Sequence, residues 1–252
     1  MDWQRDLIGL VAAVTTPVGV SGAVFLLPVQ MSVLGVPNPR LTPTNLVFNV
    51  VSGPGALIRY VRRGQLDRAL ALQLITGSVP GVVIGALLRV YVVADPQVFR
   101  LLAAAVLVPT GLLILRPPTP GSLPRRLRPR TVRALALVVG TVGGIYGIGG
   151  GSVLGPILVG TGMAVARVAP AALASTWVTS IVGVGTYAVL SSYADGPIAP
   201  DWTLGLAAGI GGLAGGWVGA SLQPRIPEAG LRRLLGVLAL VLAGWYLAQS
   251  FT

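Results

Sequence analysis

A series of long apolar segments separated by short polar breaks constrains this chain more than any other feature. A helix needs roughly 20 apolar residues to cross the hydrocarbon of a bilayer, and about eight segments approach or exceed that length. They are 7–34, 41–61, 69–93, 98–115, 134–160, 168–193, 203–222 and 231–250. Charged residues make up 10% of the chain, whereas soluble domains carry about 25%. The sequence therefore predicts an all-α integral membrane protein with several crossings.

Ionisable side chains are missing from the middle of these segments. All acidic residues fall in predicted loops or near the termini, and the chain has no His and no Cys. Proton pumps and cation carriers usually place such groups inside the membrane, and enzymes use them for acid–base or nucleophilic catalysis. We therefore expect no enzymatic activity, no metal site and no cofactor.

The basic residues are all Arg, and they give a formal net charge of +11. In a soluble protein this charge would indicate nucleic-acid binding. In a membrane chain, clustered Arg marks the loops on the cytoplasmic side. The cluster of Arg59, Arg62, Arg63 and Arg68 lies between two apolar segments and fits the second interpretation. We expect the lipid bilayer as the surroundings of the chain and no nucleic-acid partner.

A polar stretch rich in Pro and Arg, residues 116–133, divides the chain into two halves. Proline at this density prevents a continuous helix, so we predict a cytoplasmic linker there. Residues 1–115 form the N-terminal transmembrane repeat of this interpretation, and residues 134–252 form the C-terminal one.

The two halves match each other in sequence at four successive places. Gly19–Pro28 matches Gly147–Pro156, and Pro43 matches Pro170, which sets Asn49 opposite Thr176. Further along, the glycines of 77–86 match those of 211–220, and Arg100 matches Arg233. Because the matches keep the same order, they indicate an internal duplication.

The two repeats can have either the same or opposite orientations in the membrane. Four full crossings per half would make the repeats parallel, whereas a first segment folded as a re-entrant hairpin leaves three crossings and makes them inverted. The inverted arrangement moves four basic residues to the cytoplasmic side, namely Arg167, Arg225, Arg232 and Arg233. It also leaves the Arg-free stretch 194–202 outside, as the distribution of positive charge requires. We therefore favour inverted repeats whose first helices are broken at glycine.

The residues of the apolar segments that could contact a polar substrate are Gly, Ser, Thr and Asn. A helix interrupted by glycine exposes backbone N–H groups and the positive end of its dipole, and such ends bind anions without a formal charge. The candidate substrate-binding residues therefore form two groups. The first is Thr16, Ser21, Gly22, Asn45 and Asn49. The second is Gly149, Gly150, Gly151, Ser152, Ser175 and Thr176.

Close helix packing is the alternative interpretation of the small residues. We expect packing at Gly77, Gly81, Gly85, Gly211, Gly215 and Gly219. The adjacent glycines 149–151 exceed what packing needs and favour a break in the helix. Asn45 and Asn49 share one helix face, so they either line the site or join helices through hydrogen bonds. The Trp residues are typical of interfacial anchors.

These residues resemble the sulfite exporter TauE/SafE family. The resemblance rests on Gly147–Pro156 followed by Ala174–Thr176, on the degenerate copy Gly19–Pro28, and on the run 60–67. It implies a multi-pass permease of the bacterial inner membrane that exports sulfite, an organosulfonate or a related oxyanion or organic acid. It would place the site between the two Gly-rich segments. We expect transport by alternating access.

The first copy departs from the fuller pattern, because Ser21 and Ala23 stand where the second has Gly149 and Gly151. The two half-sites are therefore expected to contribute unequally. An anion channel of the same architecture and a non-transporting membrane scaffold are alternatives. The anion, the coupling ion, the direction of transport and the formation of a homodimer stay open.

Overall fold

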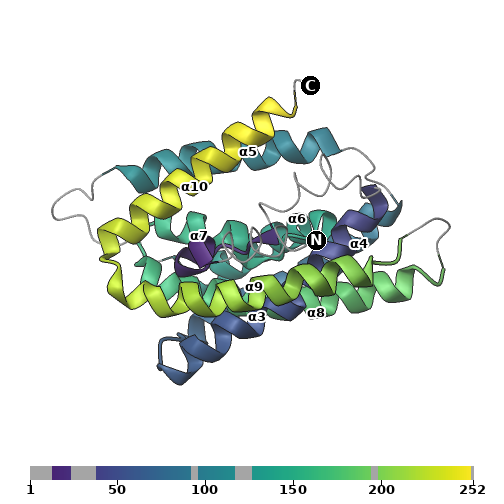
Figure 1. Cartoon of the computed structure of the whole chain (residues 1–252). Helices are drawn as coiled ribbons and strands as arrows, with labels where there is room; N and C mark the ends of the chain where they lie inside the picture. Colours follow the sequence, from purple (N-terminus) through teal and green to yellow (C-terminus); the bar gives the residue numbers. More distant parts are fainter. Residues whose placement is uncertain (1–12, 24–37, 92–95, 117–126, 194–197, 251–252) are drawn as a thin grey trace.

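The computed structural model describes residues 13–23, 38–91, 96–116, 127–193 and 198–250, and within these ranges it contains helices and no strand (Figure 1). The helices are η1 (Thr16–Val18), α3 (Asn38–Arg62), α4 (Arg68–Tyr91), α5 (Pro96–Leu115), α6 (Pro129–Tyr146), α7 (Gly151–Gly160), α8 (Val165–Leu190), α9 (Trp202–Leu222), η2 (Gln223–Arg225) and α10 (Glu228–Ala248). Much of the predicted segment 7–34 and of the linker 116–133 lies outside the described residues.

Four helical stretches in the described part of the chain are long and apolar enough to cross a membrane by length and composition. They are Arg68–Tyr91, Val165–Leu190, Trp202–Arg225 and Glu228–Ala248. The predicted all-α membrane architecture is confirmed by this finding. Two of these stretches begin with matching caps, because Asp67 accepts a hydrogen bond from the Leu70 N–H and Asp201 accepts one from the Leu204 N–H. A carboxylate at this position satisfies a backbone donor that the first turn leaves unpaired.

Glycine interrupts the helix within the predicted segment 134–160. Helix α6 ends at Tyr146, Gly147 and Gly149 have φ values of +71° and +72°, and α7 begins at Gly151. L-residues with a side chain rarely adopt such angles, so glycine is required at both points. Helix α7 has ten residues, and a helix of that length spans about 15 Å, half of the hydrocarbon thickness. The predicted break at the second Gly-rich copy is therefore confirmed.

The first Gly-rich copy is interrupted in a similar way. The short helix η1 ends at Val18, the φ of +79° at Gly19 turns the chain, and Val20 and Ser21 are not helical. The Gly19 N–H bonds the Thr16 carbonyl at 3.0 Å, as the Gly147 N–H bonds the Gly143 carbonyl at 2.8 Å. Both Gly-rich copies thus contain a non-helical point among buried residues.

Helices from opposite halves pack in pairs around these two breaks (Figure 1). Helix α4 lies against α6, α3 against α9, and α5 against α10, while α8 contacts both α3 and α4. Glycine brings α4 and α6 together: a Cβ at Gly81 would lie 2.3 Å from the Leu137 carbonyl oxygen, and one at Gly85 would lie 2.1 Å from that of Thr141. The packing interpretation is therefore confirmed for these two glycines, since no side chain fits there.

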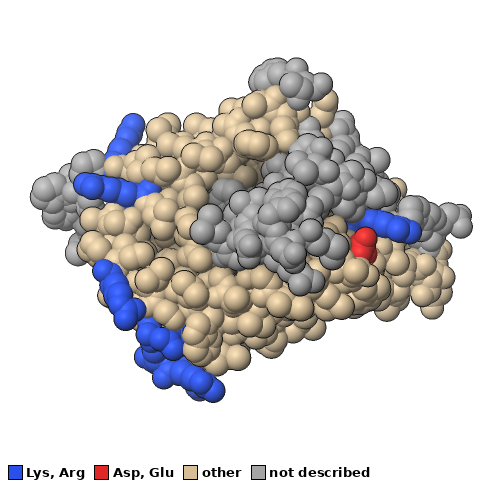
Figure 2. All heavy atoms as spheres, viewed as in Figure 1, with Lys and Arg blue, Asp and Glu red and all other residues tan. Residues whose placement is uncertain are grey.

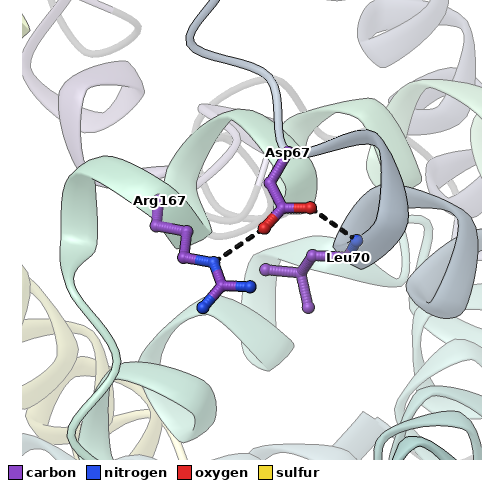
Figure 3. Close-up of polar contacts among 3 residues, drawn as sticks. All are labelled: Asp67, Leu70 and Arg167. Atoms are coloured by element: carbon purple, nitrogen blue, oxygen red, sulfur yellow. Dashed lines mark hydrogen bonds and ion pairs between the residues drawn. The ribbon is translucent and has the colours of Figure 1, made fainter.

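An ion pair joins the two halves at one end of the molecule (Figure 3). The Arg167 Nε lies 2.7 Å from a carboxylate oxygen of Asp67, and Asp67 caps α4 through the Leu70 N–H. The Glu228 carboxylate accepts a hydrogen bond from the Val165 N–H at 2.7 Å. The turn between α3 and α4 and the starts of α8 and α10 therefore meet at this end. Basic side chains gather toward one end of the face drawn in Figure 2.

Two variants at Asp67 separate its capping role from its ion pair. Asp67→Asn keeps an N-cap acceptor, so it should lower the apparent melting temperature less than Asp67→Ala, because loss of a cap costs about 0.5–2 kcal/mol. Thermal unfolding of the purified protein in detergent measures both variants. Equal melting temperatures for the two would contradict the capping role.

The ion pair of Asp67 predicts a dependence on pH. The Leu70 backbone hydrogen bond and the neighbouring Arg167 hold the pKa of the Asp67 carboxyl below its ordinary value. A carboxyl with a lowered folded-state pKa stabilises the fold above its unfolded pKa of about 3.9 and loses that contribution as the pH falls through the folded value. The wild-type advantage over Asp67→Asn should therefore persist at neutral pH and shrink below about pH 4. An advantage that stays constant on acidification would contradict this account.

Candidate functional site

A small cavity of about 30 Å³ lies where the first helix break meets α3, α8 and α9. Its wall is mostly made of small and uncharged residues, which are Thr16, Ser21, Gly22, Phe48, Asn49, Ser52, Gly53, Ala56, Leu173, Thr176, Trp177, Gly212 and Gly216. The predicted site residues Thr16, Ser21, Gly22, Asn49 and Thr176 are thus brought together from both halves. Among the described residues the lining carries no formal charge, so the polar groups that a ligand would meet here are hydroxyl, amide and backbone dipoles.

Asn49 connects the two helix breaks at this cavity. Its Oδ1 accepts a hydrogen bond from the Ser21 hydroxyl, and its Nδ2 donates to the Gly147 carbonyl at 3.4 Å. The Ser21 N–H donates to the Ser152 hydroxyl oxygen at 3.3 Å, so Ser21 also contacts the second break. Both Ser21 and Asn49 are buried. One carboxamide on α3 therefore holds the two Gly-rich copies in register.

The second Gly-rich copy is held by hydroxyls of α8. The Gly151 N–H donates to the Thr176 Oγ1 at 3.1 Å, and the Gly150 N–H donates to the Thr179 Oγ1 at 3.3 Å. A Cβ at Gly149 would lie 2.5 Å from the Thr176 Cγ2, which explains why glycine is needed there. These backbone donors are already satisfied within the protein. A ligand on this side would therefore meet the Thr176 hydroxyl and the dipole of α7 rather than the N–H groups of Gly150 and Gly151.

The other predicted site residues lie outside the cavity wall. Ser175 donates to the Ser78 hydroxyl at 3.4 Å, and Ser152 donates to the Ile148 carbonyl and borders a separate, mainly apolar cavity of about 20 Å³. Asn45 is fully buried, and its carboxamide has no hydrogen-bond partner within the described residues. A substrate-binding role for these residues and for Gly149, Gly150 and Gly151 stays a prediction.

The cavity lies on the side of the first copy for a steric reason. Gly212 and Gly216 of α9 line it without side chains, whereas the positions of α4 that the repeat matches to them are Ser78 and Val82. The Ser78 side chain lies 2.7 Å from the point where Gly150 would carry a Cβ. The equivalent space in the other half is therefore filled by side chains of α4.

Matched contacts on the two sides of the site support the internal duplication. The Tyr60 hydroxyl donates to the Thr16 carbonyl at 3.2 Å, and the Tyr187 hydroxyl donates to the Gly144 carbonyl at 2.8 Å. The repeat matches Tyr60 with Tyr187, and both side chains are fully buried. Each half thus uses a Tyr hydroxyl to bind a carbonyl that precedes a helix break.

Two close backbone contacts repeat in the same way. A Cβ at Gly19 would lie 2.5 Å from the Cα of Ala169, and one at Gly147 would lie 2.3 Å from the Thr42 carbonyl oxygen. Thr42 and Ala169 are matched positions that precede Pro43 and Pro170. The break of each half therefore packs against the helix of the other half.

Two residues of the wall were not part of the predicted site. Trp177 was interpreted as an interfacial anchor, but its indole lines the cavity next to Thr176. Ser52 lies near Asn49 on α3 and belongs to the same wall. The position of Trp177 immediately after a candidate site residue was the signal that could have identified it.

The sequence profile described as "Sulfite exporter TauE/SafE" matches residues 7–246, which is nearly the whole chain. The chain belongs to the TauE/SafE family. Two relatives from Xylella fastidiosa, strains 9a5c and Temecula1, are each named "Probable membrane transporter protein". Each is 26% identical to this chain over 256 residues, which covers 96% of the chain and 93% of the relative. No solved structure matches the chain significantly.

Membership of the TauE/SafE family confirms the resemblance seen in the sequence. Together with the apolar helices, it identifies a multi-pass membrane protein of a membrane transporter family. The family match extends across both Gly-rich copies and the linker between them.

Proposed function

We propose that this TauE/SafE family member is a permease of the bacterial inner membrane that exports a small anion by alternating access. The proposed substrates are sulfite, an organosulfonate or a related oxyanion or organic acid. The observation that carries the proposal is the uncharged cavity whose polar groups include Ser21, Asn49 and Thr176, beside two interrupted helices. Discontinuous helices of this kind form the binding sites of several transporters.

A neutral site suits transport because it lowers the cost of removing water from the anion without trapping it. The Thr176 hydroxyl and the Asn49 amide can donate hydrogen bonds, and the dipole of a helix beginning near the site favours negative charge. A buried Arg would bind the anion more tightly and slow its release. The absence of a charged group from the described cavity wall therefore supports a carrier that must release its substrate.

Inverted repeats are part of the proposal. The matched contacts of Tyr60 and Tyr187 support it, and so does the short helix α7, which is too short to cross the bilayer. Rocking of one repeat against the other would expose the cavity to each side in turn. The Arg-rich end would face the cytoplasm, where the Asp67–Arg167 pair joins the halves.

The membrane potential is a sufficient driving force for export. An inside-negative potential favours exit of a negative charge by about 2.3 kcal/mol per charge per 100 mV. No buried carboxylate is needed to couple transport to protons in this scheme. Export would therefore slow when the membrane is depolarised.

Proteoliposomes test the proposal and its alternatives directly. Purified protein is reconstituted, loaded with sulfite, sulfate, methanesulfonate or acetate, and held at defined potentials with potassium and valinomycin. The proposal expects saturable, potential-dependent flux of at least one anion. Single-channel currents would favour an anion channel of the same architecture, and no flux of any anion would favour a scaffold.

Narrowing the cavity is expected to slow transport without unfolding the protein. A methyl group at Gly216 would lie 3.5–3.7 Å from its nearest neighbours on α3, which is ordinary contact, so Gly216→Ala fits sterically. Because Gly216 lines the cavity, we expect a flux loss of about 10-fold or more, the usual scale for one extra carbon in a binding pocket. Gly244→Ala is the matched control, since nothing lies within 4 Å of its Cβ. Equal flux in both variants would contradict the assignment of the cavity.

A further inference from the structure

A proline in α3 leaves one backbone carbonyl without its helical partner. Residue 54 would normally donate its N–H to the Val50 carbonyl, but Pro54 has no N–H. The indole Nε1–H of Trp177 donates to this carbonyl at 3.0 Å. A backbone carbonyl left without its helical donor needs another one, so the proline creates an anchor point for a side chain from α8.

The indole also needs a glycine on α3, the helix that faces it. A Cβ at Gly53 would lie 2.4 Å from the Trp177 Cδ1, so only glycine leaves room for the ring. Trp177 and Gly53 both border the cavity. Three neighbouring features of α3 therefore hold the ring in place, namely the Val50 carbonyl, Gly53 and Pro54.

The bond joins equivalent points of the two repeats. Val50 is the position in the first repeat that matches Trp177 in the second. When two matched positions contact each other, the contact lies near the axis that relates the repeats, so the ring lies near the centre of their interface. The matched half has no indole at this point. The indole therefore occurs in only one of the two matched positions. It lies beside the cavity at the first helix break.

We propose that Trp177 sets the upper size of the anion that the cavity admits. Most of the other wall residues are Gly, Ala, Ser or Thr, and the second aromatic residue, Phe48, is fully buried among Ala23 and Ala208. The indole is therefore the largest side chain among the described wall residues. Its position restricts the site to compact anions, such as an inorganic oxyanion or a one-carbon sulfonate. This inference rests on the proposed function for the anionic nature of the ligand, whereas the limit on ligand size rests on the position of the indole.

The absence of Cys from the chain allows a direct measurement of the space beside the indole. Ser52→Cys places a single thiol in the cavity wall, and its reaction rate is measured with methyl and benzyl methanethiosulfonate in the intact protein. We expect the benzyl reagent to react poorly until Trp177→Ala is added, which should raise its rate about 10-fold and leave the methyl rate little changed. Trp202→Ala, an exposed indole, is the control.

Transport measurements provide a second test of the size limit. In proteoliposomes, Trp177→Ala should raise the flux of butanesulfonate relative to methanesulfonate about 10-fold. Pro54→Ala restores the missing N–H and frees the indole, so it should shift the same ratio in the same direction. A Trp177→Leu variant replaces Trp177→Ala if the latter does not purify as a folded protein.

The outcomes separate this inference from the proposed function. If the benzyl rate rises and no anion is transported by any variant, the size limit stands and the proposed permease is wrong. If wild type transports anions but neither the benzyl rate nor the flux ratio changes in the Trp177 variants, Trp177 does not set the size limit.

Discussion

Gly147→Ala is expected to abolish the accumulation of folded protein. Gly147 has a φ of +71°, and a Cβ there would lie 2.3 Å from the Thr42 carbonyl oxygen. The left-handed angle alone costs an L-residue about 1–2 kcal/mol. Overpacking adds about 1–3 kcal/mol, and here the neighbour is backbone that has little freedom to move. Expression yield and size-exclusion profile in detergent measure the effect.

Two other glycines separate the causes of this loss. Gly64 has a φ of +66° with nothing near its Cβ, so Gly64→Ala should show the strain alone and remain folded. Gly185 is helical with open space around its Cβ, so Gly185→Ala should be neutral or stabilising by up to about 1 kcal/mol. Normal yield and normal stability of Gly147→Ala would show that the close contact between the second break and α3 does not exist.

Asn49→Ala is expected to cause the largest loss of transport among variants that still fold. Truncation removes the acceptor of the Ser21 hydroxyl and the donor to the Gly147 carbonyl. Each buried group left unsatisfied costs about 1–3 kcal/mol, so both helix breaks would loosen together. A loss of about 2.7 kcal/mol in substrate binding corresponds to about 100-fold in affinity. Flux in proteoliposomes at low substrate concentration measures this loss.

Thr186→Val is the matched control for Asn49→Ala. The Thr186 hydroxyl bonds only the Val182 carbonyl of its own helix among the described contacts, so its removal should change neither flux nor stability appreciably. If Asn49→Ala keeps wild-type flux, the link between the two breaks has no part in transport.

The fold was largely predictable because hydrophobic length and glycine placement act locally. Apolar runs of spanning length predicted most of the helices, and the adjacent glycines 149–151 predicted the break, since positive φ is a property of the glycine backbone itself. The equivalent contacts of Tyr60 and Tyr187, by contrast, became visible only in the structure.

The shape of the site was not predictable to the same degree. Whether a donor is free or satisfied depends on side chains from other helices, and the capping of Gly150 and Gly151 by Thr179 and Thr176 is a tertiary contact. The position of Trp177 depends on a carbonyl freed by Pro54, one helix away. Sequence spacing within one helix contains neither kind of information.

The displacement of the site toward the first copy likewise arises from tertiary packing. Gly212 and Gly216 leave space that Ser78 and Val82 fill in the other half. The sequence match showed the difference between these positions, but not which of them faced a cavity.

The most direct test of an uncharged anion site is a thermal-shift titration of wild type, Gly216→Ala and Gly244→Ala with sulfite, sulfonates and carboxylates. A ligand at 100 times its Kd stabilises the folded state by about 2.7 kcal/mol. We expect at least one of these anions to raise the melting temperature of wild type and Gly244→Ala in a saturable way, and to raise that of Gly216→Ala clearly less at the same concentration. An equal shift in all three proteins, or no shift with any anion, would contradict a binding site between the interrupted helices.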